Sequence, residues 1–182
     1  MNALSLSRAG RGGGAAERPA FPVRGLIAHR GDGAEFPENT IPAFLSAIRK
    51  GAEMVELDER RCKTGEIVVM HDPVVDRVAG GARGNVADMT LAELKALDVG
   101  APMGERFRGT RIPTLEEALE VFPAEGMLLN LHCKIEDAAP EAAGIIRRQG
   151  RENQVVFMMD TLPGVLRRRC AARRRTGSRR GD

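Results

Sequence analysis

The sequence predicts an α/β fold with a parallel sheet, of the barrel or the doubly wound type, and two observations carry this prediction. Short apolar runs alternate with amphipathic helical segments through most of the chain, and this order builds parallel sheets. Three of the runs also end in residues that can move protons, bind phosphate or hold a metal: His29-Arg30-Gly31, Glu56 with Asp58, and His71-Asp72. Such residues at the carboxyl ends of neighbouring strands are typical of the active face of these folds.

The first strand and helix are predicted in the segment that begins near Val23. The strand covers residues 25–28, and an irregular loop follows its His-Arg-Gly ending. Asn39 or Thr40 caps the helix, which carries a proline in its first turn, as helix starts prefer. Gly51 ends the helix.

Two further strands and an insertion follow. The strands are predicted at residues 54–58 and 66–70, with the turn-forming pair Thr64-Gly65 between them. Residues 72–112 are punctuated by glycines and contain one short helix, 90–97, whose first residues have capping-box spacing. We expect this stretch to leave the main α/β pattern as an insertion.

The last units of the pattern lie between residues 114 and 158. A helix begins at Thr114, again with capping-box spacing to Glu117, and the fourth strand covers residues 127–134. A helix over about 137–149 precedes a fifth strand at 154–158. The chain therefore supplies five predicted strands, whereas an eight-stranded α/β barrel needs ~250 residues.

The two ends of the chain differ from the body, residues 23–160, in composition. Residues 1–22 are rich in Gly, Ala, Ser and Arg, and we expect a flexible leader. Residues 161–182 are an Arg-rich tail without apolar periodicity, which accounts for the net charge of +3. We interpret the tail as a replacement for missing strands, through truncation or a shifted reading frame. The alternative is a basic tail that binds nucleic acid.

Composition argues against several classes of protein. The chain has no Trp or Tyr, which argues against a nucleic-acid partner that stacks its bases on aromatic rings. Its three cysteines lack metal or disulfide spacing, which is compatible with a reducing compartment. No secretory signal and no run of ~18 apolar residues is apparent. We therefore expect a cytoplasmic protein without stable membrane insertion.

Glu56 and Asp58 are the candidate metal ligands. Side chains two positions apart on a strand share a face, and two adjacent carboxylates repel each other unless a cation lies between them. Mg²⁺ or Ca²⁺, which prefer oxygen ligands, would fit. The alternative interpretation is a solvated strand face that carries two acids.

His29 and His71 are the candidate acid and base, because histidine titrates near neutral pH and each could act on one side of a reacting group. The guanidinium of Arg30 suits phosphate oxygens. On the fourth strand, the polar residues alternate with apolar ones, so that His132 could join the metal site and Lys134 could neutralise a phosphate. The alternatives are structural histidines, a surface salt bridge and a polar edge strand.

Five motifs together closely resemble the glycerophosphodiester phosphodiesterase family over about residues 24–160. They are His29-Arg30-Gly31, Pro37-Glu38-Asn39-Thr40, Val55-Glu56-Leu57-Asp58, Val69-Met70-His71-Asp72-Pro73 and Ile112-Pro113-Thr114-Leu115-Glu116-Glu117. The resemblance implies a metal-dependent hydrolase on a TIM (β/α)8 barrel, here incomplete, with a small insertion after the third strand. An HD phosphohydrolase fits less well, because its His-Asp pair lies on a helix.

The resemblance also implies roles for individual residues. The acid/base pair would be His29 and His71, the phosphate ligands Arg30 and Lys134, the metal ligands Glu56 and Asp58, and the supporting residue Glu38. The alternation of polar residues on the fourth strand, and not the resemblance, adds Asn130 as a second supporting residue. His132 stands where the family usually has a glutamate as the third metal ligand. Because imidazole is neutral and softer than carboxylate, a transition metal becomes an alternative to Mg²⁺ or Ca²⁺.

The implied reaction is hydrolysis of a glycerophosphodiester, a small-molecule substrate, to glycerol 3-phosphate and an alcohol. One alternative is a phospholipase-D-like phosphodiesterase that acts on intact lipids. Another is a non-catalytic product with an open sheet, which exposes strand edges. The sequence predicts no particular oligomeric state.

Overall fold

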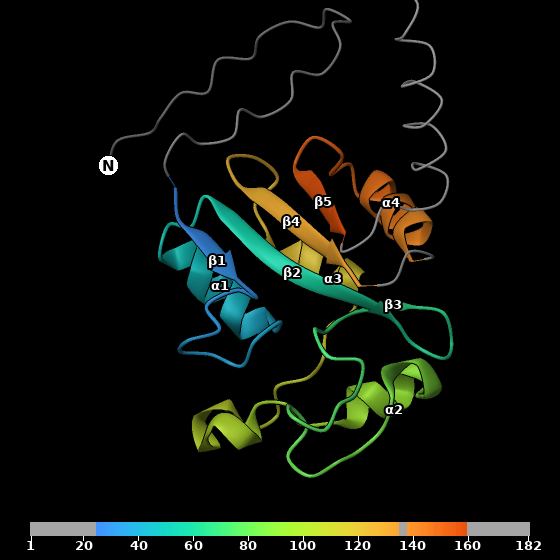
Figure 1. The fold of residues 1–182 in the computed structure, drawn as a ribbon. Coiled ribbons are helices and arrows are strands. Elements are labelled where there is room, and N and C mark those ends of the chain that lie inside the picture. The colour runs from blue at the N-terminus through green and yellow to red at the C-terminus, as the bar shows by residue number, and fades with distance from the viewer. Residues whose placement is uncertain (1–24, 135–137, 160–182) are drawn as a thin grey trace, which may run out of the picture.

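The computed structural model describes residues 25–134 and 138–159, which fold around one five-stranded sheet (Figure 1). The predicted leader at residues 1–22 and the Arg-rich tail at residues 161–182 lie outside the described residues. The strands are β1 (Ile27–His29), β2 (Met54–Arg61), β3 (Ile67–Val69), β4 (Leu128–Cys133) and β5 (Val155–Met159).

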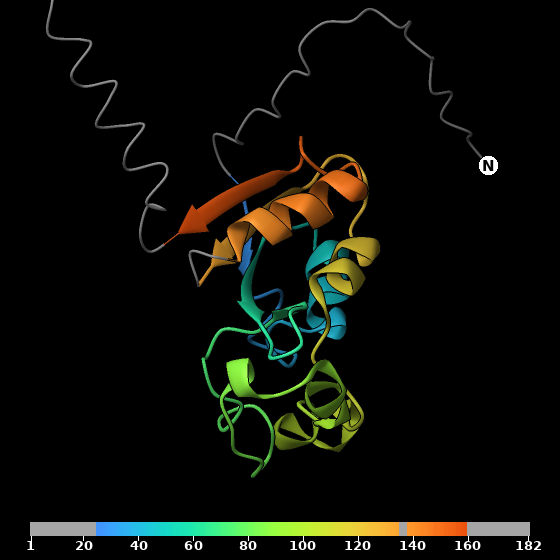
Figure 2. The ribbon, with the colours of Figure 1, turned by 90° about the vertical axis from the view of Figure 1, so that its right-hand side faces the viewer.

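Three α-helices cover one face of the sheet, as Figure 2 shows. They are α1 (Ile41–Arg49), α3 (Leu115–Val121) and α4 (Ala139–Arg148), and α3 packs against both of the others. Each lies where the sequence pattern predicts a helix. The described residues contain no helix with the length and apolar composition that crossing a bilayer requires.

The sheet is parallel except for one strand. The order is β1-β2-β4-β5, and all three of these neighbouring pairs are parallel. The segment between β2 and β4 is long enough to carry α3 back across the sheet, as a parallel connection requires. In the β2–β4 register, Glu56 lies beside Asn130 and Asp58 beside His132. The register therefore places polar residues of two strands side by side.

The prediction of a third parallel strand is wrong in its direction. β3 is antiparallel to β2 and pairs with its last three residues, with Val69 opposite Glu59. The reason is the Thr64-Gly65 turn, because so short a connection can only form a hairpin. The hairpin still brings the chain back to the site, since the N–H of Met70 donates to the carbonyl of Asp58. His71 thus reaches the same edge of the sheet by an antiparallel route.

The main core lies between the sheet and the three helices. Val55 and Leu57 of β2 and Leu129 and Leu131 of β4 have no exposed surface, and they point toward the helices. Burial of each such side chain stabilises the fold by roughly 1.5–3 kcal/mol. Since side chains alternate along a strand, Glu56, Asp58 and His132 must occupy the other face. The apolar core therefore determines which face carries the chemistry.

Residues between β3 and α3 form the insertion, which packs around a second, smaller core. It contains α2 (Leu91–Ala96) and three 3₁₀ turns, η1 (Val86–Asp88), η2 (Ala101–Met103) and η3 (Glu105–Phe107). The predicted capping boxes of Thr90 with Glu93 and of Thr114 with Glu117 are both present, at the starts of α2 and α3.

Gly31 lets α1 approach the loop after β1 closely. Its φ is +75°, and a β-carbon at this position would lie 2.9 Å from atoms of Ala43 and Phe44. Any other residue would push the helix away from the end of β1. The glycine of the His-Arg-Gly motif therefore has a packing role.

Candidate active site

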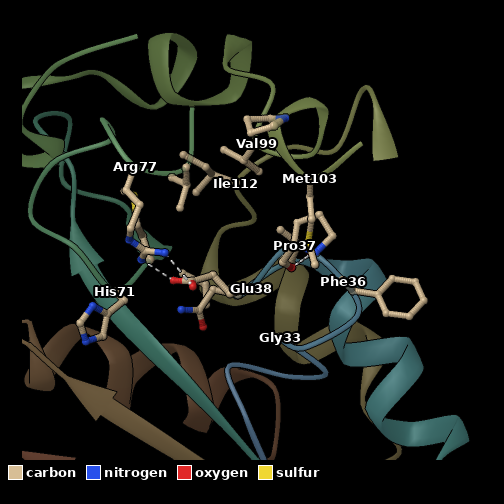
Figure 3. A pocket seen from close by; sticks show the side chains of 15 residues that line it. Gly33, Phe36, Pro37, Glu38, His71, Arg77, Val99, Met103 and Ile112 are labelled. Carbon is tan, nitrogen blue, oxygen red and sulfur yellow. Dashed lines mark hydrogen bonds and ion pairs between the residues drawn. The ribbon is translucent and has the colours of Figure 1, made fainter. Parts of the chain in front are cut away.

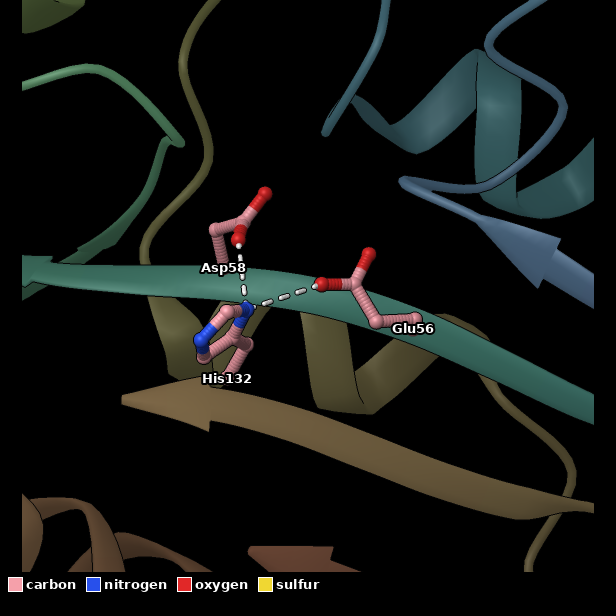
Figure 4. A group of neighbouring side chains, drawn as sticks. All are labelled: Glu56, Asp58 and His132. Atoms are coloured by element: carbon pink, nitrogen blue, oxygen red, sulfur yellow. Dashed lines mark ion pairs between the residues drawn. The ribbon is translucent and has the colours of Figure 1, made fainter. Parts of the chain in front are cut away.

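Glu56, Asp58 and His132 form a compact cluster on the sheet face opposite the helices (Figure 4). Nδ1 of His132 lies 3.6 Å from Oε1 of Glu56 and 3.4 Å from Oδ1 of Asp58. One potential ligand atom from each residue lies within 4.8 Å of the others. The structure thus brings the three predicted metal ligands together.

The two carboxylates of the cluster are both buried but have opposite pKa shifts. Burial, and then the charge of Asp58, raise the pKa of Glu56. Burial also acts to raise the pKa of Asp58, but the hydrogen bond from Asn39 and the positive charge of the nearby Lys134 outweigh it and lower that pKa. A cation beside the pair would offset both the burial and the mutual repulsion.

The donor set fits a divalent metal ion. Oδ1 of Asp58 is buried and lies 3.1 Å from Nζ of Lys134, but the angles are not those of a hydrogen bond. This oxygen therefore has unused capacity as a ligand, and it points toward His132. Two carboxylates with one imidazole can bind ions from Mg²⁺ to the transition metals.

Asn39 holds Asp58 in place, and the sequence analysis missed this contact. Nδ2 of Asn39 donates to Oδ2 of Asp58 at 2.9 Å, and the Asp58 N–H donates to Oδ1 of Asn39 at 3.2 Å. The φ of Asn39 is +57°, a conformation that asparagine tolerates better than most residues. The helix cap is Thr40, the other residue that the sequence allowed.

Arg30 also lies in the site and touches three acidic side chains. Its N–H donates to Oε2 of Glu56 at 3.0 Å. Its guanidinium donates to Oε1 of Glu38 at 3.0 Å, and its Nε lies 3.4 Å from Oδ2 of Asp58. Arg30 and Glu38, the predicted phosphate ligand and supporting residue, are therefore adjacent to the cluster.

The two candidate acid/base histidines come from different elements. His29 ends β1, and its Nε2 lies 3.9 Å from Oε2 of Glu56, with 69% of its side chain exposed. His71 follows β3, and its Nδ1 lies 2.7 Å from Oδ1 of Asp72. Both side chains are accessible to a substrate.

Two residues of β4 and its end complete the predicted set. Nζ of Lys134 lies 2.8 Å from Nδ1 of His132, in addition to its ion pair with Asp58. Oδ1 of Asn130 is buried and accepts no hydrogen bond from any described residue. The structure therefore places both residues at the cluster, as the alternation on this strand predicted.

Behind the site, on the opposite face of β2, Glu59 is fully buried, and the sequence analysis missed it. Burial is the main cause that raises its pKa to about 7, against a hydrogen bond from the Cys133 thiol. Cys133 is a buried free thiol. An acidic residue in this position gives no signal in the sequence, because the consecutive charged residues 58–61 mask the alternation.

A cavity of about 240 Å³ separates the insertion from the loop before α1 (Figure 3). Its polar wall is formed by Glu38, His71 and Arg77, and apolar side chains such as Met103 and Ile112 line the rest. Sequence reasoning missed Arg77, because a single arginine in a glycine-punctuated insertion forms no recognisable pattern.

Comparisons with known proteins agree with this geometry. Residues 29–168 match the family described as the glycerophosphoryl diester phosphodiesterase family. The glycerophosphodiester phosphodiesterase of Caldanaerobacter subterraneus is 44% identical over 131 residues, which cover 72% of this chain and 50% of that protein.

Solved structures show the same fold. A glycerophosphodiester phosphodiesterase from Agrobacterium tumefaciens aligns with a TM-score of 0.69 at 31% identity, over 75% of this chain and 58% of that one. A phosphodiesterase from Oleispira antarctica, in complex with the product sn-glycerol-3-phosphate, aligns with a TM-score of 0.68 at 31% identity. That alignment covers 80% of this chain and 61% of the other.

The chain spans about half the length of the curated relatives it matches. Its four parallel strands and their helices are accordingly part of a (β/α)8 barrel, and the predicted fold class, an incomplete TIM barrel, is confirmed.

Proposed function

Because the chain belongs to the glycerophosphoryl diester phosphodiesterase family, we propose that it hydrolyses glycerophosphodiesters to glycerol 3-phosphate and an alcohol. The observation that carries the proposal is the cluster of Glu56, Asp58 and His132, with Arg30 and a candidate acid/base histidine touching it. The phosphodiesterase from Oleispira antarctica, whose structure holds sn-glycerol-3-phosphate as product, supports the choice of substrate class.

The cluster would hold one divalent ion, which when bound supplies positive charge that offsets the charge developing on the phosphate. Mg²⁺ or Ca²⁺ is the proposed ion, because two of the three ligands are carboxylates. The imidazole of His132 makes a transition metal such as Mn²⁺ the alternative.

Two cations of the chain would bind the phosphate of the substrate. Arg30 presents a planar guanidinium that can donate two parallel hydrogen bonds to phosphate oxygens. Lys134 adds a point charge beside Asp58. Glu38 keeps Arg30 oriented, and Asn130 would support the site through its buried carbonyl oxygen.

His29 and His71 would move the protons. One would take the proton from the attacking hydroxyl, and the other would protonate the leaving alkoxide, each contributing roughly 10²–10⁴-fold to the rate. His71 is oriented by Asp72, whereas His29 is oriented by Glu56 at a longer distance.

The reaction would belong to lipid and glycerol metabolism, and we propose the cytoplasm as its location. The described cysteines, Cys62 and Cys133, are buried thiols, which are compatible with a reducing compartment. Cell fractionation with an antibody to the chain would test the location.

An assay of the full chain tests the function. Purified protein with Mg²⁺, Ca²⁺ or Mn²⁺ is incubated with glycerophosphocholine, and glycerol 3-phosphate is measured by a coupled dehydrogenase. We expect hydrolysis that chelation abolishes and that His29→Ala or His71→Ala lowers at least about 100-fold. The exposed residue Glu125 provides a control, Glu125→Ala, with unchanged turnover.

Three outcomes would overturn the proposal. Full activity of either histidine variant would remove the assigned acid/base pair. Turnover of phosphatidylcholine vesicles without turnover of the soluble diester would favour the phospholipase-D-like alternative. A chain that binds the ion but hydrolyses neither substrate would be the non-catalytic product.

A further inference from the structure

Arg77, a residue of the insertion, joins two carboxylates that border the site. Its Nε donates to Oδ2 of Asp72 at 2.7 Å. Its two terminal nitrogens donate to the two oxygens of Glu38 at 2.6 and 2.9 Å, as Figure 3 shows for the latter pair. All three guanidinium nitrogens of Arg77 therefore donate hydrogen bonds. The planar group can reach both carboxylates only in this one orientation.

Asp72, which Arg77 holds in one orientation, in turn orients the ring of His71. Oδ1 of Asp72 lies 2.7 Å from Nδ1 of His71, while its Oδ2 is held by Arg77. The hydrogen bond from Arg77 is the main cause that lowers the pKa of Asp72 to about 2, so the carboxylate is an acceptor at neutral pH. A neutral His71 must then carry its proton on Nδ1.

The remaining nitrogen of His71 is thereby the reactive one. Nε2 of His71 has no hydrogen-bond partner among the residues that the structure describes. With Nδ1 protonated, Nε2 holds the lone pair that a base needs, and it becomes the donor when the ring is charged. This orientation through a carboxylate resembles the way a third group orients the base in catalytic triads.

Glu38, which Arg77 also holds, orients the guanidinium of Arg30. One oxygen of Glu38, Oε1, accepts from both Arg30 and Arg77, at 3.0 and 2.6 Å. The hydrogen bonds from Arg77 are also the main cause that lowers the pKa of Glu38. Arg77 thus contacts Asp72, the partner of His71. It also contacts Glu38, the partner of Arg30.

We propose that Arg77 is a positioning residue that fixes His71 in the Nδ1-protonated tautomer and holds Arg30 toward the phosphate. The roles of His71 and Arg30 rest on the proposed function, whereas the tautomer itself does not. Through Arg77, the insertion would contribute a positioning residue to the site.

The competing explanation is an ordinary surface salt bridge that fastens the insertion. The side chain of Arg77 is 49% exposed, and exposed ion pairs contribute little to stability. Such a pair would leave the tautomer of His71 unchanged when it is removed. The tautomer therefore separates the two explanations.

The experiment uses the full chain labelled with ¹⁵N-histidine. Long-range ¹H–¹⁵N correlation spectra near pH 8 report which ring nitrogen of each histidine carries the proton, and His71→Gln assigns the His71 signals. We expect Nδ1–H in the unmodified chain and a mixture of tautomers in Arg77→Met. Arg83→Met is the matched control, since Arg83 belongs to the same insertion and pairs only weakly with Asp76, at 3.6 Å. It should leave His71 unchanged.

A second variant and a second readout keep the test decisive. Arg77→Lys retains the charge but cannot bridge both carboxylates, so it should give an intermediate tautomer ratio even if Arg77→Met does not fold. In the hydrolysis assay, Arg77→Met should lower kcat about tenfold, which is part of what a general acid or base contributes. It should also raise KM, because Glu38 and Arg30 would no longer be held toward the phosphate.

The outcomes are distinguishable from those of the proposed function. A changed tautomer in a chain without hydrolysis would support the positioning role and refute the activity. An identical His71 spectrum in the unmodified chain, Arg77→Met and Arg77→Lys would overturn the positioning role, whatever the activity.

Discussion

Asp58 and His132 are direct neighbours across the β2–β4 ladder, and Oδ1 of Asp58 lies 3.4 Å from Nδ1 of His132. Because the two strands are parallel and in this register, their side chains leave the sheet on the same face. The cluster of candidate metal ligands is thus a consequence of strand register, and no loop is needed to assemble it.

The imidazole in this position should affect the choice of metal. His132→Glu would replace a soft neutral ligand with a hard anionic one, so the affinity for Mg²⁺ should rise and that for Zn²⁺ should fall. Isothermal titration calorimetry with both ions measures the change. Equal shifts for both ions, in the same direction, would mean that His132 does not touch the metal.

Asn39 should matter for metal binding although it is not a ligand. Asn39→Ala removes both hydrogen bonds to Asp58, and loss of a group that orients a ligand typically lowers metal affinity ~10–100-fold. Asn85→Ala is the matched control, because Asn85 caps a 3₁₀ turn in the insertion. Metal affinity should fall in the first variant and stay constant in the second.

Gly31 and Gly51 offer a matched pair for the close approach of α1. Their φ values are +75° and +76°, but only Gly31 has neighbours that a β-carbon would meet. Gly51→Ala should therefore cost only the backbone strain, about 1–2 kcal/mol. Gly31→Ala should cost about 3 kcal/mol or more, because overpacking is added. Urea denaturation measures both, and equal losses would refute the packing role of Gly31.

Asp72 should make the free energy of unfolding depend on pH in the acidic range. Its pKa in the folded chain is about 2, whereas an unfolded aspartate has a pKa near 4, so folding favours the charged form. The stabilisation, at most about 2 kcal/mol, is complete above pH 4 and is lost as the pH falls toward 2. The difference in unfolding free energy between the unmodified chain and Asp72→Asn should shrink over that range. A constant difference would contradict the assigned pKa.

Helices and parallel strands were predictable because their signals are local. Capping boxes at Thr90 and Thr114, and the apolar alternation of β2 and β4, reflect interactions within a few residues or across one sheet face. The Thr64-Gly65 turn also predicts a hairpin, and a hairpin requires β3 to run antiparallel to β2.

The contacts that orient the site were not predictable in the same way. Asn39 meets Asp58, and Arg77 meets Glu38, across 19 and 39 residues of sequence. Such pairs form only when the chain folds, and neither an asparagine nor an arginine in the sequence indicates which residue it will contact. The sequence was enough to name the functional residues at the strand ends. The residues that orient them could be identified only from the structure.

Binding of a divalent ion by the full chain tests the central claim most directly. Mn²⁺ titration followed by electron paramagnetic resonance counts the ions bound and measures their affinity. We expect one ion per chain, with binding lost in Asp58→Asn and kept in Glu125→Ala. Undiminished Mn²⁺ binding in Asp58→Asn, or no binding by the unmodified chain, would contradict it.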